Sequence, residues 1–389
     1  MKCLMVTPYL GEVYGGPSKC VLELAEAIAH HTDHITQLDI VTTNANGNDD
    51  LDVPLDTWMN DRACRIRYFP RLGAKHYTFS PSLTRWLFQN TGHYDIVHTH
   101  TVFSYPVLPA HIACHRYRVP YIRTPHGMLE PWALAHKAQK KRLYYRWLEQ
   151  PFLNRAAAVH TLAPPEHQNL QQLKLTSSVV TIPNGIHTQE FERLPSPDYF
   201  FQQFPHLCDK TLILFLGRID PKKGLDLLIP AFASLRSQFP SAHLILAGPD
   251  SNGYRSTAET LVKQAPCEDS ITFTGMLMGD AKLAALAAAQ VYTAPSYSEG
   301  FSMSVLEAMA CGLPCVITTG CNFPEAAQAQ AAHVVDIDAE AIATALHHCL
   351  RHPNEAKALG DRARKLILEN YTWDIIAKRM IETYQTIVA

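Results

Sequence analysis

The sequence predicts an α/β protein made of two doubly wound, Rossmann-like halves. Short apolar strands alternate with amphipathic helices along most of the 389 residues, which is the pattern of parallel sheets with helices on both faces. The alternation is interrupted at residues 192–208, which are rich in proline and phenylalanine, and then starts again. A chain of this length is able to bury two separate cores.

The first half opens with a strand at residues 2–8, a loop that contains glycines, and a helix at residues 18–30. Gly15 and Gly16 lie in this loop, where glycine lets the backbone approach a ligand closely. The spacing is not GxGxxG, so a dinucleotide fingerprint is absent and a plain tight turn is the alternative interpretation. Residues 44–77 carry few signals of regular structure. Further strands are predicted at residues 35–43, 95–100, 121–127, 156–161 and 179–186.

The second half repeats this architecture without repeating the sequence. We expect a first domain of residues 1–190 and a second domain of residues 191–370. Residues 371–389 are expected to form a C-terminal helix, for which packing back on the first domain is one arrangement. The strands predicted in the second half are residues 211–216, 243–247, 270–274, 291–294, 315–319 and 333–335.

Composition limits the class of protein. The net charge is −2, so no overall basic field favours nucleic acid as a partner. The ten cysteines include no CxxC pair, and no cleavable signal opens the chain, so we expect free thiols in a reducing cytoplasm. No apolar run approaches the roughly 20 residues that a membrane-spanning helix needs.

Residues 296–314 are the most informative stretch of the chain. A polar loop leads into a predicted helix that starts near Phe301, with Glu299 before the helix and Glu307 within it. The unpaired amides of a helix start attract anionic groups, and carboxylates accept hydrogen bonds from hydroxyl groups. This pattern suits a ligand that carries both phosphate and hydroxyls, such as a nucleotide sugar. An ordinary acidic helix cap is the alternative.

Two cations follow the first strand of the second half. Arg218 and Lys223 are separated by a turn that contains Pro221, so both side chains are able to converge on one diphosphate. Such donors stabilise the charge that a departing diphosphate develops. A solvated, charged loop is the alternative. Because this loop and residues 296–314 both follow strands of one domain, we expect them to share a crevice.

Histidines end two neighbouring strands of the first half. His98 and His100 lie on one face of a strand end, and His126 follows the next strand. No third ligand accompanies the first two, so no metal site is predicted. His98 suits a structural role, whereas His126, beside Gly127, is the candidate for contact with substrate.

Residues 132–153 are predicted to form a long helix in which basic and aromatic side chains alternate. This pattern is typical of a helix that lies on a membrane surface. A surface helix whose aromatic side chains pack on the core is the alternative. The cations are Lys137, Lys140, Lys141, Arg142 and Arg146.

Taken together, these motifs resemble a known family. Gly217-Arg218 with Lys223-Gly224, followed by Glu299-Gly-Phe-Ser-Met and Glu307-Ala-Met-Ala-Cys-Gly-Leu-Pro, is similar to the retaining glycosyltransferases of the GT-B fold known as glycosyl transferases group 1. The likeness covers essentially the whole chain and is closest in character to members that build exopolysaccharides and other surface glycans. It implies two Rossmann-like domains facing a central cleft, an acceptor-side first domain and a second domain that binds the nucleotide sugar.

The resemblance also implies roles for individual residues. Glu307 would bind the ribose diol, and Arg218 and Lys223 would clamp the diphosphate. Glu299 would hold hydroxyls of the donor sugar, and Ser302 stands where many relatives have glycine. The catalytic residues implied are His126, Arg218, Lys223 and Glu299. The donor-binding residues implied are Gly15, Gly16, Gly217, Met276, Leu277, Gly300, Phe301, Ser302, Met303 and Glu307.

The activity implied is retaining, metal-independent transfer of a hexose to a glycan or lipid-linked saccharide in polysaccharide biosynthesis. UDP-glucose is the expected donor and GDP-mannose the next; the nucleotide sugar is a co-substrate, and no cofactor is expected. We expect a cytoplasmic protein, with residues 132–153 as the candidate for peripheral contact with the inner face of the membrane. The alternatives are a nucleotide-sugar epimerase of the same fold and a non-catalytic protein that binds nucleotide sugars.

Overall fold

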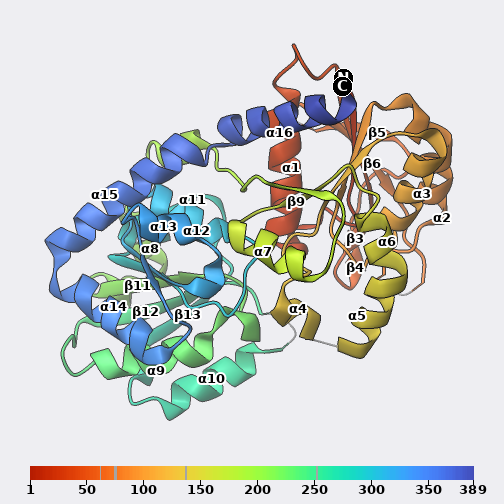
Figure 1. The fold of residues 1–389 in the computed structure, drawn as a ribbon. Helices are drawn as coiled ribbons and strands as arrows, with labels where there is room; N and C mark the ends of the chain where they lie inside the picture. The colour runs from red at the N-terminus through yellow and green to blue at the C-terminus, as the bar shows by residue number, and fades with distance from the viewer. Residues whose placement is uncertain (62, 74–76, 136–137, 251–252) are drawn as a thin grey trace. The chain divides into compact units, whose positions relative to one another are not determined.

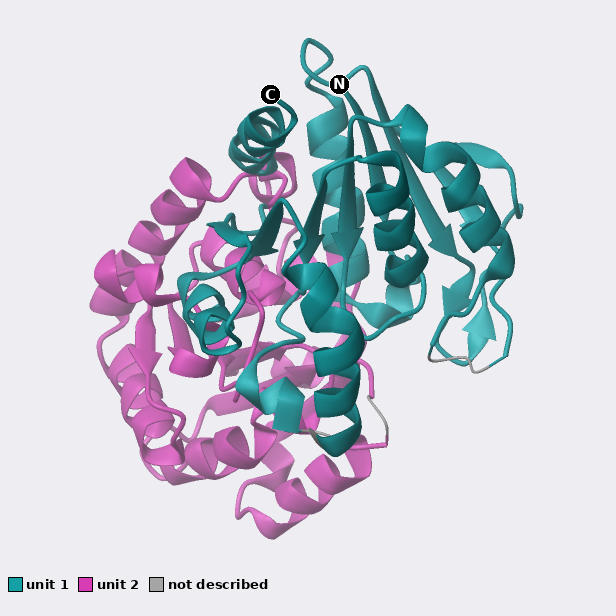
Figure 2. Ribbon diagram, turned by 45° about the vertical axis from the view of Figure 1, so that its right-hand side comes forward, with its two compact units in different colours: residues 1–185, 373–389 teal, residues 186–372 magenta. Residues whose placement is uncertain are grey.

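The computed structural model describes residues 1–389 except 62, 74–76, 136–137 and 251–252. The chain divides into two compact units, which are shown in different colours in Figure 2. Unit 1 comprises residues 1–185 and 373–389, and unit 2 comprises residues 186–372. The first division lies five residues before the boundary expected from the sequence, and the second lies two residues after it.

Unit 1 is built on a sheet whose described strands run in the order β10-β9-β8-β7-β1-β2-β6-β5. All neighbours are parallel except β5, which pairs antiparallel with β6. The strands are β1 (Lys2–Val6), β2 (Gln37–Thr43), β5 (Trp58–Asp61), β6 (Cys64–Phe69), β7 (Ile96–His100), β8 (Tyr121–Thr124), β9 (Ala158–Thr161) and β10 (Ser178–Thr181). A two-stranded ribbon consists of β3 (Ala45–Asn46) and β4 (Asp49–Asp50).

The sequence showed few signals of regular structure in residues 44–77, but the described residues of this range form the four strands β3, β4, β5 and β6. β6 is recognisable in retrospect from alternation, because Cys64 and Ile66 are buried whereas Arg65 and Arg67 are partly exposed on the opposite face. The strand was not predicted because only one of its faces packs on the core, and the other face carries charged side chains.

The helices of unit 1 flank this sheet. The C-terminal helix α16 packs against α1, as Figure 1 shows. Trp373 at the start of α16 donates its indole N–H to the buried Glu23 carboxylate of α1, at 2.9 Å. The helices are α1 (Gly16–Ala29), α2 (Pro81–Asn90), α3 (Val107–Tyr117), α4 (Pro131–Ala135), α5 (Ala138–Tyr144), α6 (Gln150–Leu153), α7 (Pro164–Gln172) and α16 (Trp373–Val388).

Unit 2 is built on a fully parallel sheet with the order β13-β12-β11-β14-β15-β16 among its described residues. The strands are β11 (Thr211–Leu216), β12 (Ala242–Ala247), β13 (Ile271–Gly275), β14 (Val291–Ala294), β15 (Cys315–Thr318) and β16 (His333–Val335). The helices are α8 (Asp198–Gln203), α9 (Leu225–Leu235), α10 (Arg255–Gln264), α11 (Gly279–Ala288), α12 (Met303–Ala310), α13 (Pro324–Gln328), α14 (Ala339–Arg351) and α15 (Pro353–Asn370).

Candidate functional site

The loops that follow β11 and β14 meet at the carboxyl end of the unit 2 sheet. Gly224 has φ 71°, and a Cβ added there would lie 2.0 Å from the carbonyl oxygen of Pro295. Glycine is therefore required for this close approach. The Tyr297 amide donates to the Lys222 carbonyl at 2.9 Å. These contacts hold the lysine loop beside the glutamate loop.

The same contacts bring Lys223 and Glu299 together. The Lys223 ammonium donates to Glu299 Oε1 at 2.6 Å, and the Ser296 hydroxyl donates to the same oxygen at 2.7 Å. Lys222 Nζ lies 3.9 Å from the other carboxylate oxygen. Burial by itself raises the pKa of Glu299, but the two lysines outweigh it and the pKa is lowered. Glu299 is therefore an ionised carboxylate with its oxygens already engaged.

Glu307 forms another ion pair of unit 2, in which its carboxylate is buried. It lies in α12 and is 5% exposed, and its Oε1 accepts a hydrogen bond from Lys282 Nζ on α11 at 2.8 Å. The helix begins at Met303, two residues later than expected, with Ser302 at the N-cap position. The residues predicted to present free amides, 300–303, therefore span the end of the loop and the helix start.

The remaining residues predicted for unit 2 follow neighbouring strands. Gly217 follows β11, and a Cβ there would contact the Lys223 side chain at 3.5 Å. Arg218 is exposed, and no contact joins it to the Lys223–Glu299 pair. Met276, which is 51% exposed, and Leu277 follow β13. The structure thus groups Lys223, Glu299 and Ser296 through direct contacts.

In unit 1, four side chains form a continuous hydrogen-bonded chain. His160 Nε2 lies 2.7 Å from the Ile182 carbonyl, so it carries a proton and His160 Nδ1 accepts from the Thr124 hydroxyl at 2.8 Å. Thr124 in turn accepts from His98 Nε2 at 2.6 Å, and His98 Nδ1 accepts from the Tyr384 hydroxyl at 2.6 Å. The Ile182 carbonyl therefore fixes the tautomers of His160 and His98 and the direction of each hydrogen bond in the chain. The chain is complete only when both histidines are neutral.

His126 lies beside this chain through His100. The rings of His98 and His100 stack with centroids 4.2 Å apart, and His100 Nδ1 lies 3.1 Å from His126 Nε2. The other nitrogen of His100 is buried without a partner among the described residues. A buried N–H without an acceptor is costly, so the geometry favours donation from His100 Nδ1 to His126. His126, which is partly exposed and has φ 54°, then keeps Nδ1–H for a ligand.

Burial sets the protonation state of these histidines. It lowers the pKa of His126 to about 3 and the pKa of His160 to about 4. The pKa values of His98 and His100 are also lowered, first by burial and then by neighbouring histidines. The cluster is therefore neutral at pH 7. No group of three or more His, Cys, Asp or Glu side chains in the described parts of the chain has the arrangement of a metal site.

The glycine loop of unit 1 leads directly into α1. Gly15 has φ 70° and precedes the helix, and Gly16 is its first residue. A Cβ at either position would meet no atom within 4 Å. Gly15 therefore serves the backbone conformation, and both glycines leave the helix start open rather than fitting a tight internal contact.

The basic and aromatic segment departs from a single α-helix. It consists of α4, α5, a π-helical turn at Tyr145–Glu149 and α6. Lys137 lies outside the described residues. Tyr144 is half-buried and donates to or accepts from Tyr77 at 2.9 Å, whereas Leu143 is 63% exposed and Trp147 69% exposed. The inner aromatics thus pack on unit 1, while an apolar pair faces outward.

Four functional candidates were not predicted from the sequence. Lys282 is one of several helix lysines, and its pairing with Glu307 joins α11 to α12, which the sequence does not indicate. His160 and Tyr384 join the histidine chain from distant segments. Lys222 had a signal, because it is adjacent to Lys223 in the same loop.

Comparison with known proteins identifies both units. Residues 15–185 match the glycosyl transferase 4-like domain, and residues 198–366 match glycosyl transferases group 1. The chain therefore carries a glycosyl transferase 4-like domain followed by a glycosyl transferases group 1 domain. It is a glycosyltransferase of the GT-B fold, as the motifs predicted.

Relatives of this glycosyltransferase include mannosyltransferases. The phosphatidyl-myo-inositol mannosyltransferase of Mycobacterium leprae is 28% identical over 100% of this chain and 97% of its own length. The GDP-mannose-dependent alpha-(1-6)-phosphatidylinositol monomannoside mannosyltransferase of Mycolicibacterium smegmatis is 29% identical over 52% of this chain and 54% of its own length.

Solved structures share the fold of this glycosyltransferase. Sucrose-phosphate synthase from Thermosynechococcus elongatus superposes with a TM-score of 0.78 at 24% identity, covering 100% of this chain and 99% of that one. HepE from Anabaena in complex with UDP-glucose gives 0.77 at 18% identity, covering 99% and 100%. Within the described residues, no helix combines the length and apolar character needed to cross a bilayer.

Proposed function

We propose that this glycosyltransferase moves a mannose from GDP-mannose to a hydroxyl of a lipid-linked acceptor, with retention of configuration and without a metal ion. The observation that carries the proposal is the pair of ion pairs in unit 2, Lys223–Glu299 and Lys282–Glu307. Each offers a cation for phosphate and a carboxylate for hydroxyls, at the end of the sheet where ligands bind in doubly wound folds.

In this proposal the two ion pairs bind different parts of the nucleotide sugar. Lys223 and the exposed Arg218 bind the diphosphate, which gains negative charge as its bond to the sugar breaks. An ammonium group has three donors, so Lys223 is able to hold a phosphate oxygen while keeping Glu299. Glu299 and the amides of residues 300–303 bind sugar hydroxyls, and Glu307 binds the ribose diol. Gly15 and Gly16, Gly217, Met276 and Leu277 complete the donor contacts.

Retention follows in this proposal without a protein nucleophile. Both Lys223 and Ser296 donate to Glu299 Oε1, which lowers the nucleophilicity of that carboxylate. A leaving-phosphate oxygen accepts the proton of the acceptor hydroxyl as the new bond forms on the same face. His126 contributes a neutral N–H donor to a hydroxyl of the transferred sugar.

Similarity to relatives favours GDP-mannose as the nucleotide sugar. Both relatives described above are named as mannosyltransferases. The one from Mycolicibacterium smegmatis is named as GDP-mannose-dependent. UDP-glucose is the second candidate, because HepE shares the fold and was solved with it. In both cases the diphosphate and the hexose meet the same groups.

Contact with a membrane surface is the second part of the proposal. Leu143 and Trp147 are four residues apart, expose their side chains and lie among Lys140, Arg142 and Arg146. A segment that lies on a membrane surface needs two features. It has apolar side chains that insert between the lipid headgroups, and it has cations that bind anionic lipid. Such contact brings a lipid-linked acceptor to the enzyme.

Donor titration with nucleotide release tests the activity. We expect GDP-mannose at about 100 times its Kd to stabilise the chain by about 2.7 kcal/mol, and GDP release to require an acceptor from a membrane extract. Release at equal rate without acceptor would indicate an epimerase, and binding without turnover a sensor; either result contradicts the proposal. Lys223→Ala should remove the stabilisation, whereas Lys210→Ala, an exposed lysine of the same unit, should keep it.

Sedimentation with vesicles of anionic and neutral lipid tests the membrane contact. The double substitution Leu143→Ser and Trp147→Ser should abolish sedimentation with anionic vesicles and leave thermal stability unchanged, because both side chains are exposed. The matched control is Tyr199→Ser, which alters an aromatic side chain of unit 2 that is 44% exposed. Sedimentation that is equal for all three proteins would refute the contact.

A further inference from the structure

A pocket of about 870 Å³ lies in unit 1 at the amino-terminal ends of β8 and β9. His126 follows the carboxyl end of β8, so the pocket lies at the opposite end of the sheet from the histidine cluster. Its remaining walls come from the last turn of α3, from α6 and from the end of α16. The volume is within the range of pockets that hold small organic ligands.

Three arginines line this pocket and no carboxylate side chain does. Arg116, Arg118 and Arg155 are all exposed. The side chains of Arg118 and Arg155 form no hydrogen bond or ion pair with any described residue. The Arg116 guanidinium lies 5.8 Å from the ring centroid of Tyr117. Guanidinium groups offer planar pairs of donors that match phosphate or carboxylate. Their charge is therefore available to an anion.

The other wall of the pocket is apolar. Val119, Phe152, Ile387 and Val388 contribute to it, and Val388 is 41% exposed. His111 also lines the pocket: its Nε2 lies 3.0 Å from the Thr99 hydroxyl, while its Nδ1 is buried and has no partner among the described atoms. A ligand that filled the pocket would thus find apolar surface and a cationic rim.

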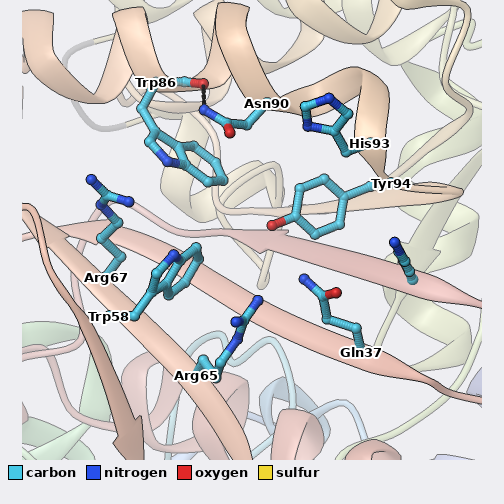
Figure 3. A pocket seen from close by; sticks show the side chains of 9 residues that line it. Gln37, Trp58, Arg65, Arg67, Trp86, Asn90, His93 and Tyr94 are labelled. Atoms are coloured by element: carbon cyan, nitrogen blue, oxygen red, sulfur yellow. Dashed lines mark hydrogen bonds between the residues drawn. The ribbon is translucent and has the colours of Figure 1, made fainter.

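A second pocket of unit 1 is also lined by arginines, but these arginines are paired with carboxylates (Figure 3). It measures about 330 Å³, and the strand side chains Trp58, Arg65 and Arg67 face Trp86 from α2 across it. Each of its arginines already has a carboxylate, because Arg65 pairs with Asp39 at 2.7 Å and Arg67 with Asp56 at 2.7 Å. The charge of both arginines is therefore neutralised within the protein. The guanidinium carbon of Arg65 lies 4.8 Å from the centroid of the Trp58 ring.

We propose that the larger pocket binds an anionic amphiphile, that is, an apolar chain with a phosphate headgroup. The chain lies along Phe152, Ile387 and Val388, and the phosphate meets Arg116, Arg118 and Arg155. The proposal does not depend on the glycosyl-transfer reaction, because the pocket shares no residue with the donor site proposed above.

Calorimetric titration of the full chain with dodecyl phosphate, below its micelle concentration, tests this site. Dodecyl maltoside supplies the same chain without charge, and inorganic phosphate supplies the charge without the chain. We expect both to bind at least about tenfold more weakly than dodecyl phosphate, because a charge-assisted contact or a few buried methylenes each account for such a factor. If either control binds as tightly, or dodecyl phosphate does not bind, the proposal is wrong.

Variants locate the binding. Arg155→Gln should weaken dodecyl phosphate about tenfold, and Val388→Glu should weaken it further by placing a carboxylate on the apolar wall. Arg85→Gln, an exposed arginine of α2 outside the pocket, should leave the affinity unchanged. All three positions are exposed, so the variants should keep the melting temperature of the free protein and its affinity for GDP-mannose. Unchanged dodecyl phosphate affinity in both pocket variants would overturn the proposal, even if donor binding behaves as expected.

Discussion

Unit 2 and unit 1 place polar groups at strand ends according to different chemistry. In unit 2, buried carboxylates meet lysines, as Glu299 meets Lys223 and Glu307 meets Lys282. In unit 1, buried histidines meet hydroxyls and one carbonyl, and burial keeps them neutral. Charged pairs suit a site that must exchange partners with a diphosphate. A neutral network suits a rigid arrangement that orients one hydrogen-bond donor, the His126 N–H.

The difference also explains what the sequence could predict. The residues of unit 2 lie in two short motifs, so Lys223, Glu299 and Glu307 were identified as candidates from those motifs and from the family resemblance that they carry. The histidine chain is assembled from β7, β8, β9 and the C-terminal helix, so the joining of Tyr384 to His98 requires the fold. Lys282 was not predicted for the same reason, because nothing in its own segment indicates that its side chain reaches Glu307 in α12.

The strand pattern was predicted where both faces of a strand are buried. β11 and β12 are nearly continuous apolar runs and were found in the sequence. β5 and β6 lie at the edge of the unit 1 sheet and carry Arg65 and Arg67, which disguise the alternation. The basic segment was predicted as one α-helix, but composition does not reveal the π-helical turn at Tyr145–Glu149.

The largest expected effect comes from breaking the first ion pair. Lys223→Met removes the cation nearest to Glu299, and we expect glycosyl transfer to fall by about 100- to 1,000-fold. The variant should also lose about 1–3 kcal/mol of stability, because a buried carboxylate loses its main partner. In a double-mutant cycle with Glu299→Gln, the stability losses should be smaller together than their sum. Additive losses would contradict a direct pair.

The second ion pair should give a smaller effect. Lys282→Met leaves Glu307 without its lysine, and we expect GDP-mannose to bind about tenfold more weakly because the carboxylate loses its orientation. The control is Lys263→Met, which removes a lysine from the neighbouring helix α10. A donor Kd that is the same for both variants would exclude a role for Lys282 at the site.

The neutral histidine network should make the stability of unit 1 depend on pH. His126 and His160 have folded pKa values of about 3 and 4, below the ordinary value of 6.5. Between pH 6.5 and these values the unfolded chain binds more protons, so stability is complete above about pH 6.5 and falls as the pH is lowered toward 4. Hydrogen exchange of the β7–β9 amides should report this loss. Protection that is constant or increases as the pH falls from 6.5 to 5 would contradict it.

The smallest expected effect concerns the end of the network. Tyr384→Phe removes one hydroxyl that donates to His98, and we expect a loss of about 1 kcal/mol in stability. Because Tyr384 is buried and packs against the His98 ring, the phenylalanine should keep the packing. Thermal unfolding of Tyr384→Phe beside Tyr199→Phe, an exposed tyrosine of unit 2, measures the difference. No difference would show that the hydrogen bond makes no net contribution.

A crystal structure of the chain with GDP-mannose tests the central claim most directly. We expect a phosphate oxygen at about 2.9 Å from Lys223 Nζ, and the ribose hydroxyls at a similar distance from the Glu307 carboxylate. Nucleotide density at the carboxyl ends of β11 and β14 but without contact to these two side chains, or density elsewhere on the protein, would contradict the assignment of the donor site.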